Sequence, residues 1–181
     1  MSRDQTPAPR SAPQFSVMDL FTIGVGPSSS HTVGPMRAAA SFAVLALLHG
    51  KPTSLRCELF GSLALTGKGH GTDTAILMGL SGWLPEELDP RKIPDIVANI
   101  RTSETLLLRG ETPIAFHARD IVFRMGEFLP QHANALRFTA LFSDGREIAQ
   151  TYFSIGGGAV LTEGQESDRP NVAVRYPYSS A

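Results

Sequence analysis

Leu136-Arg137-Phe138-Thr139-Ala140-Leu141-Phe142-Ser143-Asp144-Gly145 is the stretch of sequence that decides the class of fold. Apolar side chains recur at every second position from Leu136 to Phe142, which predicts a strand with one buried face. Asp144-Gly145 is typical of a hairpin turn, so we expect a return strand over about 147–154. The second half of the chain is therefore predicted to be rich in antiparallel strands.

The segments around this hairpin alternate between strand and helix patterns. Leu55, Cys57 and Leu59 alternate with charged residues and predict a strand that leads to Gly61. Asp89-Pro90 opens a helix whose apolar residues are spaced i, i+3, i+4 and i+7. Further helices are expected over about 38–48 and 73–80, and further strands over about 105–108, 113–116 and 121–123. The predicted fold is mixed α/β (α+β), with an antiparallel-rich sheet and helices packed on one side of it.

The composition limits what the chain can be. Its 181 residues predict one domain, and 42% hydrophobic with 18% charged residues can build a core. The formal net charge of -1 gives no electrostatic reason to expect a nucleic acid or an anionic membrane as a partner. Cys57 is the one cysteine, so this chain cannot form an internal disulfide or a multi-cysteine metal site by itself. We expect no targeting or membrane-spanning segment, and a cytoplasmic location.

The first segment that could carry chemistry is Gly26-Pro27-Ser28-Ser29-Ser30-His31-Thr32. It has no helix or strand period and precedes Pro35, which suits the first turn of a helix. Hydroxyls, backbone N–H groups and the positive end of the helix dipole would converge there, which favours a bound carboxylate. The structural alternative is a serine-rich capping loop.

The second segment is Thr66-Gly67-Lys68-Gly69-His70-Gly71-Thr72-Asp73. We expect a loop over 61–72, followed by a helix that Thr72 caps and in which Asp73 occupies the first turn. A glycine-rich backbone can approach a ligand closely, with the Lys68 cation and the titratable His70 beside it. A phosphate-binding P-loop does not fit, because Gly69 stands where a hydroxyl residue belongs. The alternative is a flexible turn.

The third segment is Ser154-Ile155-Gly156-Gly157-Gly158, at a strand end. Its glycines allow either a strained structural turn or close approach of the backbone to a ligand, and the segment by itself favours the structural interpretation. His132 precedes a strand and is placed where it could face a cleft. His49 and His117 read as structural or surface residues. The sequence contains no Gly-x-Ser-x-Gly motif, the turn that usually presents a nucleophilic serine, so catalysis by such a serine is not expected.

Four segments resemble the motifs of the iron–sulfur L-serine dehydratases (L-serine ammonia-lyases). They cover residues 15–36, 61–70, 132–138 and 152–158, and the similarity runs from about Phe15 to the end of the chain. The resemblance implies conversion of L-serine to pyruvate and ammonia without pyridoxal phosphate, as part of serine catabolism and gluconeogenesis. It implies a 4Fe–4S cluster with one iron acting as a Lewis acid on the serine hydroxyl.

Members of the family hold the cluster by three thiolates on a separate, helical α domain. One cysteine cannot replace three, so this chain resembles the β domain alone, which is similar to the allosteric substrate-binding domain of some phosphoglycerate dehydrogenases. We expect a disordered tail over 1–14, the β domain over 15–162, and a polar linker towards the α domain over 163–181. The chain would then be a truncated reading frame, an isolated domain or a split subunit, and inactive alone. The complete enzyme is expected to be a homodimer.

The resemblance also suggests roles for individual residues. His70 is the expected general base or proton-handling group, and Lys68 would offset the charge of the substrate carboxylate. His132 is either a second cleft residue or a helper at a domain interface. No residue is expected to bind a metal. The residues expected to bind L-serine are Ser28, Ser29, Ser30, His31, Thr32, Thr72, Asp73, His132, Gly156 and Gly157.

These roles predict how the side chains are arranged in space. If one cleft exists, Ser28, Ser30, His31, Lys68 and His70 should border a single concave surface. The alternative function is a non-catalytic regulatory module that binds L-serine or another small carboxylate. A cofactor-free hydrolase is the third alternative.

Overall fold

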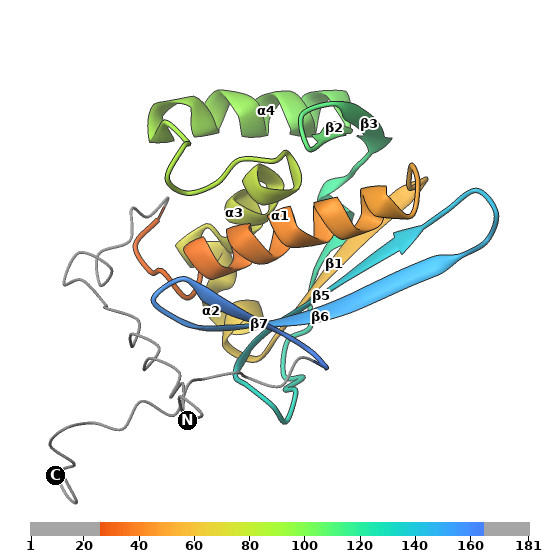
Figure 1. The fold of residues 1–181 in the computed structure, drawn as a ribbon. Helices are drawn as coiled ribbons and strands as arrows, with labels where there is room; N and C mark the ends of the chain where they lie inside the picture. Colours follow the sequence, from red (N-terminus) through yellow and green to blue (C-terminus); the bar gives the residue numbers. More distant parts are fainter. Residues whose placement is uncertain (1–25, 165–181) are drawn as a thin grey trace, which may run out of the picture.

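The computed structural model describes residues 26–164, and its centre is a five-stranded sheet (Figure 1). The strand order is β4-β1-β5-β6-β7, with β1 and β4 parallel and the other neighbours antiparallel. The strands are β1 (Ser54–Phe60), β4 (Ile121–Phe123), β5 (Asn134–Leu141), β6 (Glu147–Gly156) and β7 (Ala159–Thr162). A separate two-stranded sheet joins β2 (Thr105–Leu108) to β3 (Thr112–Ala115). The predicted antiparallel-rich mixed sheet is confirmed.

The helices form the second layer. Helix α1 (Val33–Leu48) lies across the sheet, α3 (Thr72–Leu80) packs against α1, and α4 (Ile93–Ser103) lies outside α3 (Figure 1). Helix α2 (Gly61–His70) follows directly from the end of β1, and the short 3-10 turns η2 (Pro90–Lys92) and η3 (Ala118–Asp120) precede α4 and β4. None of the helices over residues 26–164 has the length and apolar character that crossing a bilayer requires.

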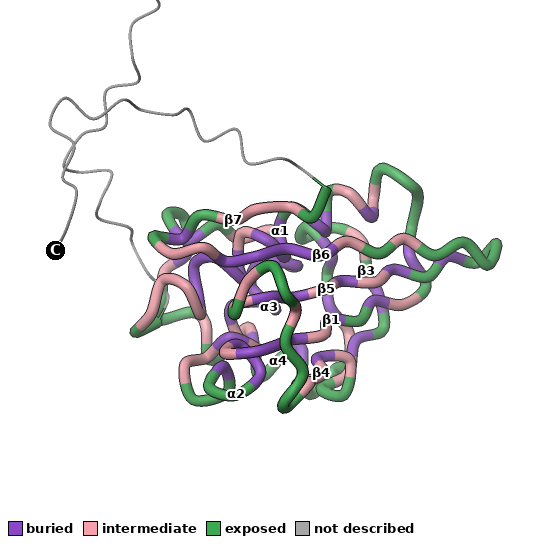
Figure 2. Tube along the Cα trace, turned by 90° about the horizontal axis from the view of Figure 1, so that it is seen from below, coloured by how far each residue is buried: buried purple, intermediate pink, exposed green. Residues whose placement is uncertain are grey.

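The core lies between the sheet and these helices. Alternation along β1 and β5 turns Leu55, Cys57, Leu59, Leu136, Phe138 and Ala140 to the same buried face. Phe138 stacks on Phe42 of α1 with ring centroids 5.1 Å apart, and Tyr152 meets Phe138 edge-on at 6.0 Å. Burial raises the pKa of Tyr152 to about 12. Figure 2 shows the centre of the sheet buried and the far end of the β5–β6 hairpin exposed.

Helix α1 is buried on two sides because its side chains are small. Ala38, Ala39, Ala43 and Ala46 are fully buried, and α3 lies close against this surface. The approach is closest at Gly79, where a Cβ atom would lie 2.1 Å from the carbonyl oxygen of Met36. Glycine is therefore required there by contact with backbone rather than by its own dihedral angles.

The expected loop over 61–72 is wrong: residues Gly61–His70 form helix α2. The glycines suggested a loop, but Leu63 and Ala64 bury against the core and favour a helix. The first amides of the helix also find partners outside it, since Gly61 N donates to Glu127 O and Ser62 N donates to Ala133 O. Tertiary contacts thus outweigh the weak helix propensity of Gly67 and Gly69.

The predicted N-cap is also wrong by one residue. Gly71, with φ of 76°, ends α2 in the left-handed conformation and stands at the N-cap position of α3. Thr72 lies inside α3, and its hydroxyl donates instead to the carbonyl oxygen of His31. Asp73 occupies the first turn of α3, as expected.

Strand β7 is the element that the sequence does not predict. Gly156, Gly157 and Gly158 all have positive φ angles and turn the chain back, so that β7 pairs with β6. This is the structural interpretation of the glycine run, in which only glycine adopts three such conformations in succession without strain. The expected tail over 1–14 lies outside the described residues, as does all but the start of the expected linker.

Two glycine substitutions in neighbouring helices should have opposite effects on stability. Gly79→Ala should lower the free energy of unfolding by about 1–3 kcal/mol, because the new methyl group would overlap the Met36 carbonyl. Gly69→Ala is the control: nothing lies within 4 Å of a Cβ there, so the change should raise stability by about 0.5–1 kcal/mol. Urea denaturation of both variants measures the difference, and a neutral Gly79→Ala would contradict the close α1–α3 packing.

Candidate active site

The four sequence motifs meet at one end of the molecule. Figure 1 shows the start of α1, helix α2 and the turn between β6 and β7 at the same end of the sheet, away from the β5–β6 turn. Thr72 Oγ1 donates to His31 O at 2.7 Å, although 41 positions separate the two residues. Ser62 N donates to Ala133 O, and Asn134 Nδ2 donates to Ser154 O at 3.3 Å. Hydrogen bonds therefore connect each motif to a neighbouring one.

The serine segment folds into a compact turn ahead of α1. Ser28 O accepts hydrogen bonds from His31 N, Thr32 N and Thr32 Oγ1, and Ser29 O accepts one from Gly34 N. Three of the backbone donors that the sequence assigned to a carboxylate, the amides of His31, Thr32 and Gly34, are thus engaged within the turn itself. The side chains that the turn offers to a ligand are the hydroxyls of Ser28 and Ser30, which lie 3.2 Å apart, and the His31 imidazole.

The His31 ring has a hydroxyl at each nitrogen. Nδ1 lies 3.0 Å from Ser30 Oγ and 3.3 Å from Ser28 Oγ, and Nε2 lies 3.1 Å from Ser62 Oγ. Hydroxyls both donate and accept, so this arrangement can support either tautomer of the neutral ring. Ser62 is a site residue that the sequence analysis missed. Ser62 stands at the start of the second motif, which could have drawn attention to it. The predicted loop, however, gave no indication of where the Ser62 side chain points.

His70 lies directly beside His31. The two ring centroids are 4.9 Å apart, and the ring planes are tilted by 40°. His70 Nδ1 lies 2.8 Å from the carbonyl oxygen of Thr66, one helical turn earlier. A carbonyl can only accept, so Nδ1 carries a proton, and in the neutral ring the lone pair is on Nε2. His70 is therefore held in the tautomer that can take a proton at Nε2.

The pair of imidazoles is electrostatically asymmetric. Burial lowers the pKa of His31 below its ordinary value, and the neighbouring His70 lowers it further, because two positive rings in contact repel. His31 consequently remains neutral to lower pH than a solvated histidine. A neutral His31 can accept or donate a hydrogen bond, whereas an imidazolium can only donate.

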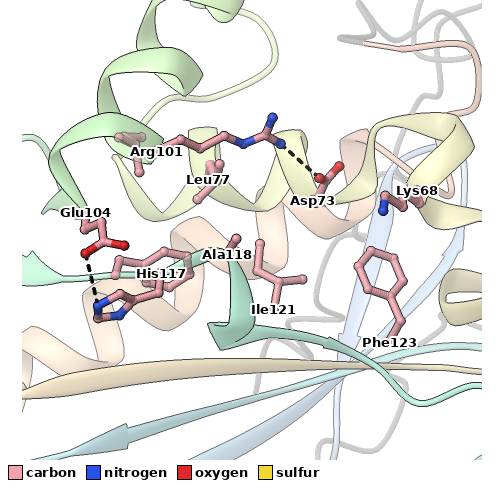
Figure 3. A pocket seen from close by; sticks show the side chains of 11 residues that line it. Lys68, Asp73, Leu77, Arg101, Glu104, His117, Ala118, Ile121 and Phe123 are labelled. Atoms are coloured by element: carbon pink, nitrogen blue, oxygen red, sulfur yellow. Dashed lines mark hydrogen bonds and ion pairs between the residues drawn. The ribbon is translucent and has the colours of Figure 1, made fainter.

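Lys68 and Asp73 face a cavity of about 420 Å³ whose walls do not include His31 or His70 (Figure 3). Asp73 pairs there with Arg101 of α4 at 3.2 Å. The structure thus brings His31 into contact with Ser28, Ser30 and His70, and places the Lys68 and Asp73 side chains along a second hollow. Direct roles for Lys68 and Asp73 in serine binding stay predictions.

His132 and the glycine run lie further along the same end of the sheet. His132 Nδ1 accepts a hydrogen bond from Asn134 N, and its side chain lines a cavity of about 310 Å³ together with Phe153, Ile155 and Leu161. Gly156 and Gly157 form the partly exposed β6–β7 turn. Their contact with a substrate stays a prediction, as does that of His132.

The residues that the structure describes do not fit an iron–sulfur cluster. Cys57 is completely buried in β1, and burial raises the pKa of its thiol well above the ordinary value. A cluster ligand must instead be a thiolate that reaches the metal. Within residues 26–164, no three side chains of histidine, cysteine, aspartate or glutamate gather as a metal site would need.

The fold and the site together define a mixed α/β domain that presents paired imidazoles and hydroxyls at one end of its sheet. The family model described as serine dehydratase beta chain matches residues 16–165. The chain belongs to the serine dehydratase beta-chain family, as the motifs indicated. Its likeness to the phosphoglycerate dehydrogenase domain stays a prediction.

Several curated proteins are similar over most of the chain. The L-serine dehydratase of Mycobacterium bovis is 47% identical over 174 residues, and L-serine dehydratase 2 of Escherichia coli is 44% identical over 174 residues. The L-serine dehydratase of Streptomyces coelicolor is 44% identical over 173 residues. These matches cover 91–92% of this chain but 38% of each relative, so the chain spans well under half of their length.

The asymmetry of the histidine pair predicts a pH titration. In NMR spectra of the chain, His31 should protonate at a pH below 6.5, and His70→Gln should raise the His31 pKa by removing a positive neighbour. Burial remains in that variant, so the His31 pKa should stay below the ordinary value. His49→Gln, at the exposed end of α1, is the matched control and should leave His31 unchanged. A His31 pKa at or above 6.5 would contradict the geometry.

Proposed function

We propose that this chain is the β domain of an iron–sulfur L-serine dehydratase and supplies part of the cleft that converts L-serine to pyruvate and ammonia. The observation that carries the proposal is the His31–His70 pair with its hydroxyls, at the end of the sheet where all four motifs meet. The names of the similar proteins support the same reaction. They favour an enzyme over the regulatory-module alternative.

His70 acts as the base in this proposal. Its Nε2 takes the α-proton of L-serine, the electron pair of the broken C–H bond forms the Cα–Cβ double bond, and hydroxide leaves Cβ. The resulting enamine tautomerises to an imine, which water hydrolyses to pyruvate and ammonia. The hydrogen bond from Nδ1 to Thr66 O stabilises the ring as positive charge develops on it.

The serine turn binds the substrate. Ser28 and Ser30 offer hydroxyl donors to the substrate carboxylate, and neutral His31 holds them through Nδ1 while Ser62 fixes its other nitrogen. Ser29, Thr32 and Thr72 position the turn through the backbone contacts described above. His132, Gly156 and Gly157 would line the side of the cleft nearest the sheet edge, and Lys68 would contribute positive charge.

The cluster and its protein ligands belong to the partner in this proposal. The described residues do not fit a cluster, so in this proposal its three thiolates come from an α domain or subunit. The relatives are long enough to contain such a domain, because this chain covers 38% of their length. The complete enzyme would work without pyridoxal phosphate, in the cytoplasm and as a homodimer. It would contribute pyruvate from serine catabolism to gluconeogenesis.

A domain exchange tests the proposal directly. We expect this chain, joined in place of the matching segment of Escherichia coli L-serine dehydratase 2, to restore anaerobic formation of pyruvate from L-serine, because the two are 44% identical there. The parent enzyme and the same enzyme lacking the segment are the controls. A chimera that assembles and loads iron like the parent but leaves L-serine unreacted would refute the function proposed for this chain.

Within that chimera, His70→Ala should lower kcat by about 10²–10⁴-fold and change KM much less, since the base acts in the transition state. His49→Ala alters an exposed histidine elsewhere on the domain and should leave both constants unchanged. An unchanged kcat for His70→Ala would reassign His70 to a structural role.

A further inference from the structure

A cavity with an apolar wall lies beside the histidine site but does not include its two histidines. It has a volume of about 420 Å³ and lies between helices α3 and α4 and the segment that runs from η3 into β4 (Figure 3). This volume is within the range of sites for small molecules. The apolar wall is made by Leu77, Ile100, Phe116, Ile121 and Phe123.

The charged groups at its rim comprise one ion pair, two carboxylates that face the same histidine, and one lysine that pairs with none of the described carboxylates. The histidine carries a charge only when it is protonated. Arg101 pairs with Asp73 at 3.2 Å. Glu104 lies 3.6 Å from Nε2 of His117, and Nδ1 of His117 lies 3.3 Å from Asp120 (Figure 3). Lys68 projects over Phe123 at the other end of the cavity and forms no ion pair with any residue over 26–164. The cavity therefore has an apolar wall, a cation at one end that no described carboxylate pairs with, and the carboxylates around His117 at the other end.

We propose that this cavity binds a small monocarboxylate with an apolar body. The carboxylate pairs with Lys68, and the apolar body covers Phe123, Ile121 and Leu77. Burying apolar ligand surface against this wall is favourable. Arg101, the other cation at the rim, already pairs with Asp73, so Lys68 is the cation left for a carboxylate. L-serine is too small and too polar to use such a wall, so this ligand differs from the proposed substrate. The inference shares Lys68 with the proposed function but does not use His31 or His70, which lie outside the walls.

The location gives the site a direct connection to the rest of the domain. Lys68 and His70 share the last turn of α2, and Asp73 follows Thr72, whose hydroxyl holds the His31 carbonyl. A ligand on Lys68 and beside Asp73 thus contacts both sides of the α2–α3 junction. Binding there would therefore act on the α2–α3 junction, the same backbone that positions the two histidines.

Calorimetric titration of the 181-residue chain with 4-phenylbutanoate tests the site. We expect saturable binding, at least about tenfold tighter than that of 4-phenylbutan-1-ol, which lacks the charge. Lys68→Gln should weaken binding of the carboxylate by about tenfold, whereas Lys92→Gln, on an exposed turn, should not.

A second pair of variants keeps the test independent of charge. Ala118 is exposed and lines the cavity, so Ala118→Leu should fill the entrance and abolish binding without disturbing the core. Ala98→Leu, on the exposed side of α4, should bind like the unaltered chain. The proposal is overturned by absence of saturable binding, by equal affinity for the alcohol, or by binding that neither Lys68→Gln nor Ala118→Leu reduces. None of these results bears on the serine-to-pyruvate reaction of the chimera.

Discussion

The arrangement of this domain depends on the close contact between helices α1 and α3. Gly79 lets the backbone of α3 approach the Met36 carbonyl, and the alanines of α1 provide a flat surface for that approach. With this spacing the start of α3 lies beside the start of α1, where Thr72 can donate to His31 O. A larger residue at position 79 would separate these helix ends and with them the two histidines.

The chemistry of the site depends on which hydrogen-bond donors and acceptors are already paired within the protein. Carbonyls of the serine turn accept from the amides of His31, Thr32 and Gly34, so these donors at the start of α1 are engaged before any ligand arrives. The Thr66 carbonyl likewise fixes the proton of His70 on Nδ1. Side-chain hydroxyls and the Nε2 lone pair of His70 are among the groups that a substrate could use. A site built in this way is preorganised, because its backbone does not have to rearrange when a ligand binds.

Much of the fold was predictable because the strands alternate cleanly. Leu136, Phe138 and Ala140 indicated the buried face of β5, and Asp144-Gly145 indicated the hairpin. Helix α2 was not predictable from local preference, since its glycines favour a loop and its stability comes from Leu63 in the core and from acceptors in the segment before β5. Strand β7 was missed because a glycine run ends a pattern without indicating whether the chain turns back.

The site was predictable in composition but only partly in geometry. The approach of His31 to His70 followed from the motifs, whereas the hydroxyl of Ser62 required the direction of α2 to be known. Once α2 is a helix, Lys68 and His70 project at different angles around its axis. Lys68 therefore lines the cavity beside α3, whereas His70 lies beside His31 and outside that cavity.

The pairing of β1 with β5 also constrains how the domain can be made. Cys57 lies opposite Phe138, and the residues between them form three helices, a small hairpin and an edge strand. A nascent chain that has emerged only as far as β4 has its central strand without its antiparallel neighbour and α1 without most of the sheet beneath it. Such non-local pairing slows folding, because the loop must close before its contacts form. The β5–β6 hairpin, which is local in sequence, is then the natural place for the sheet to begin.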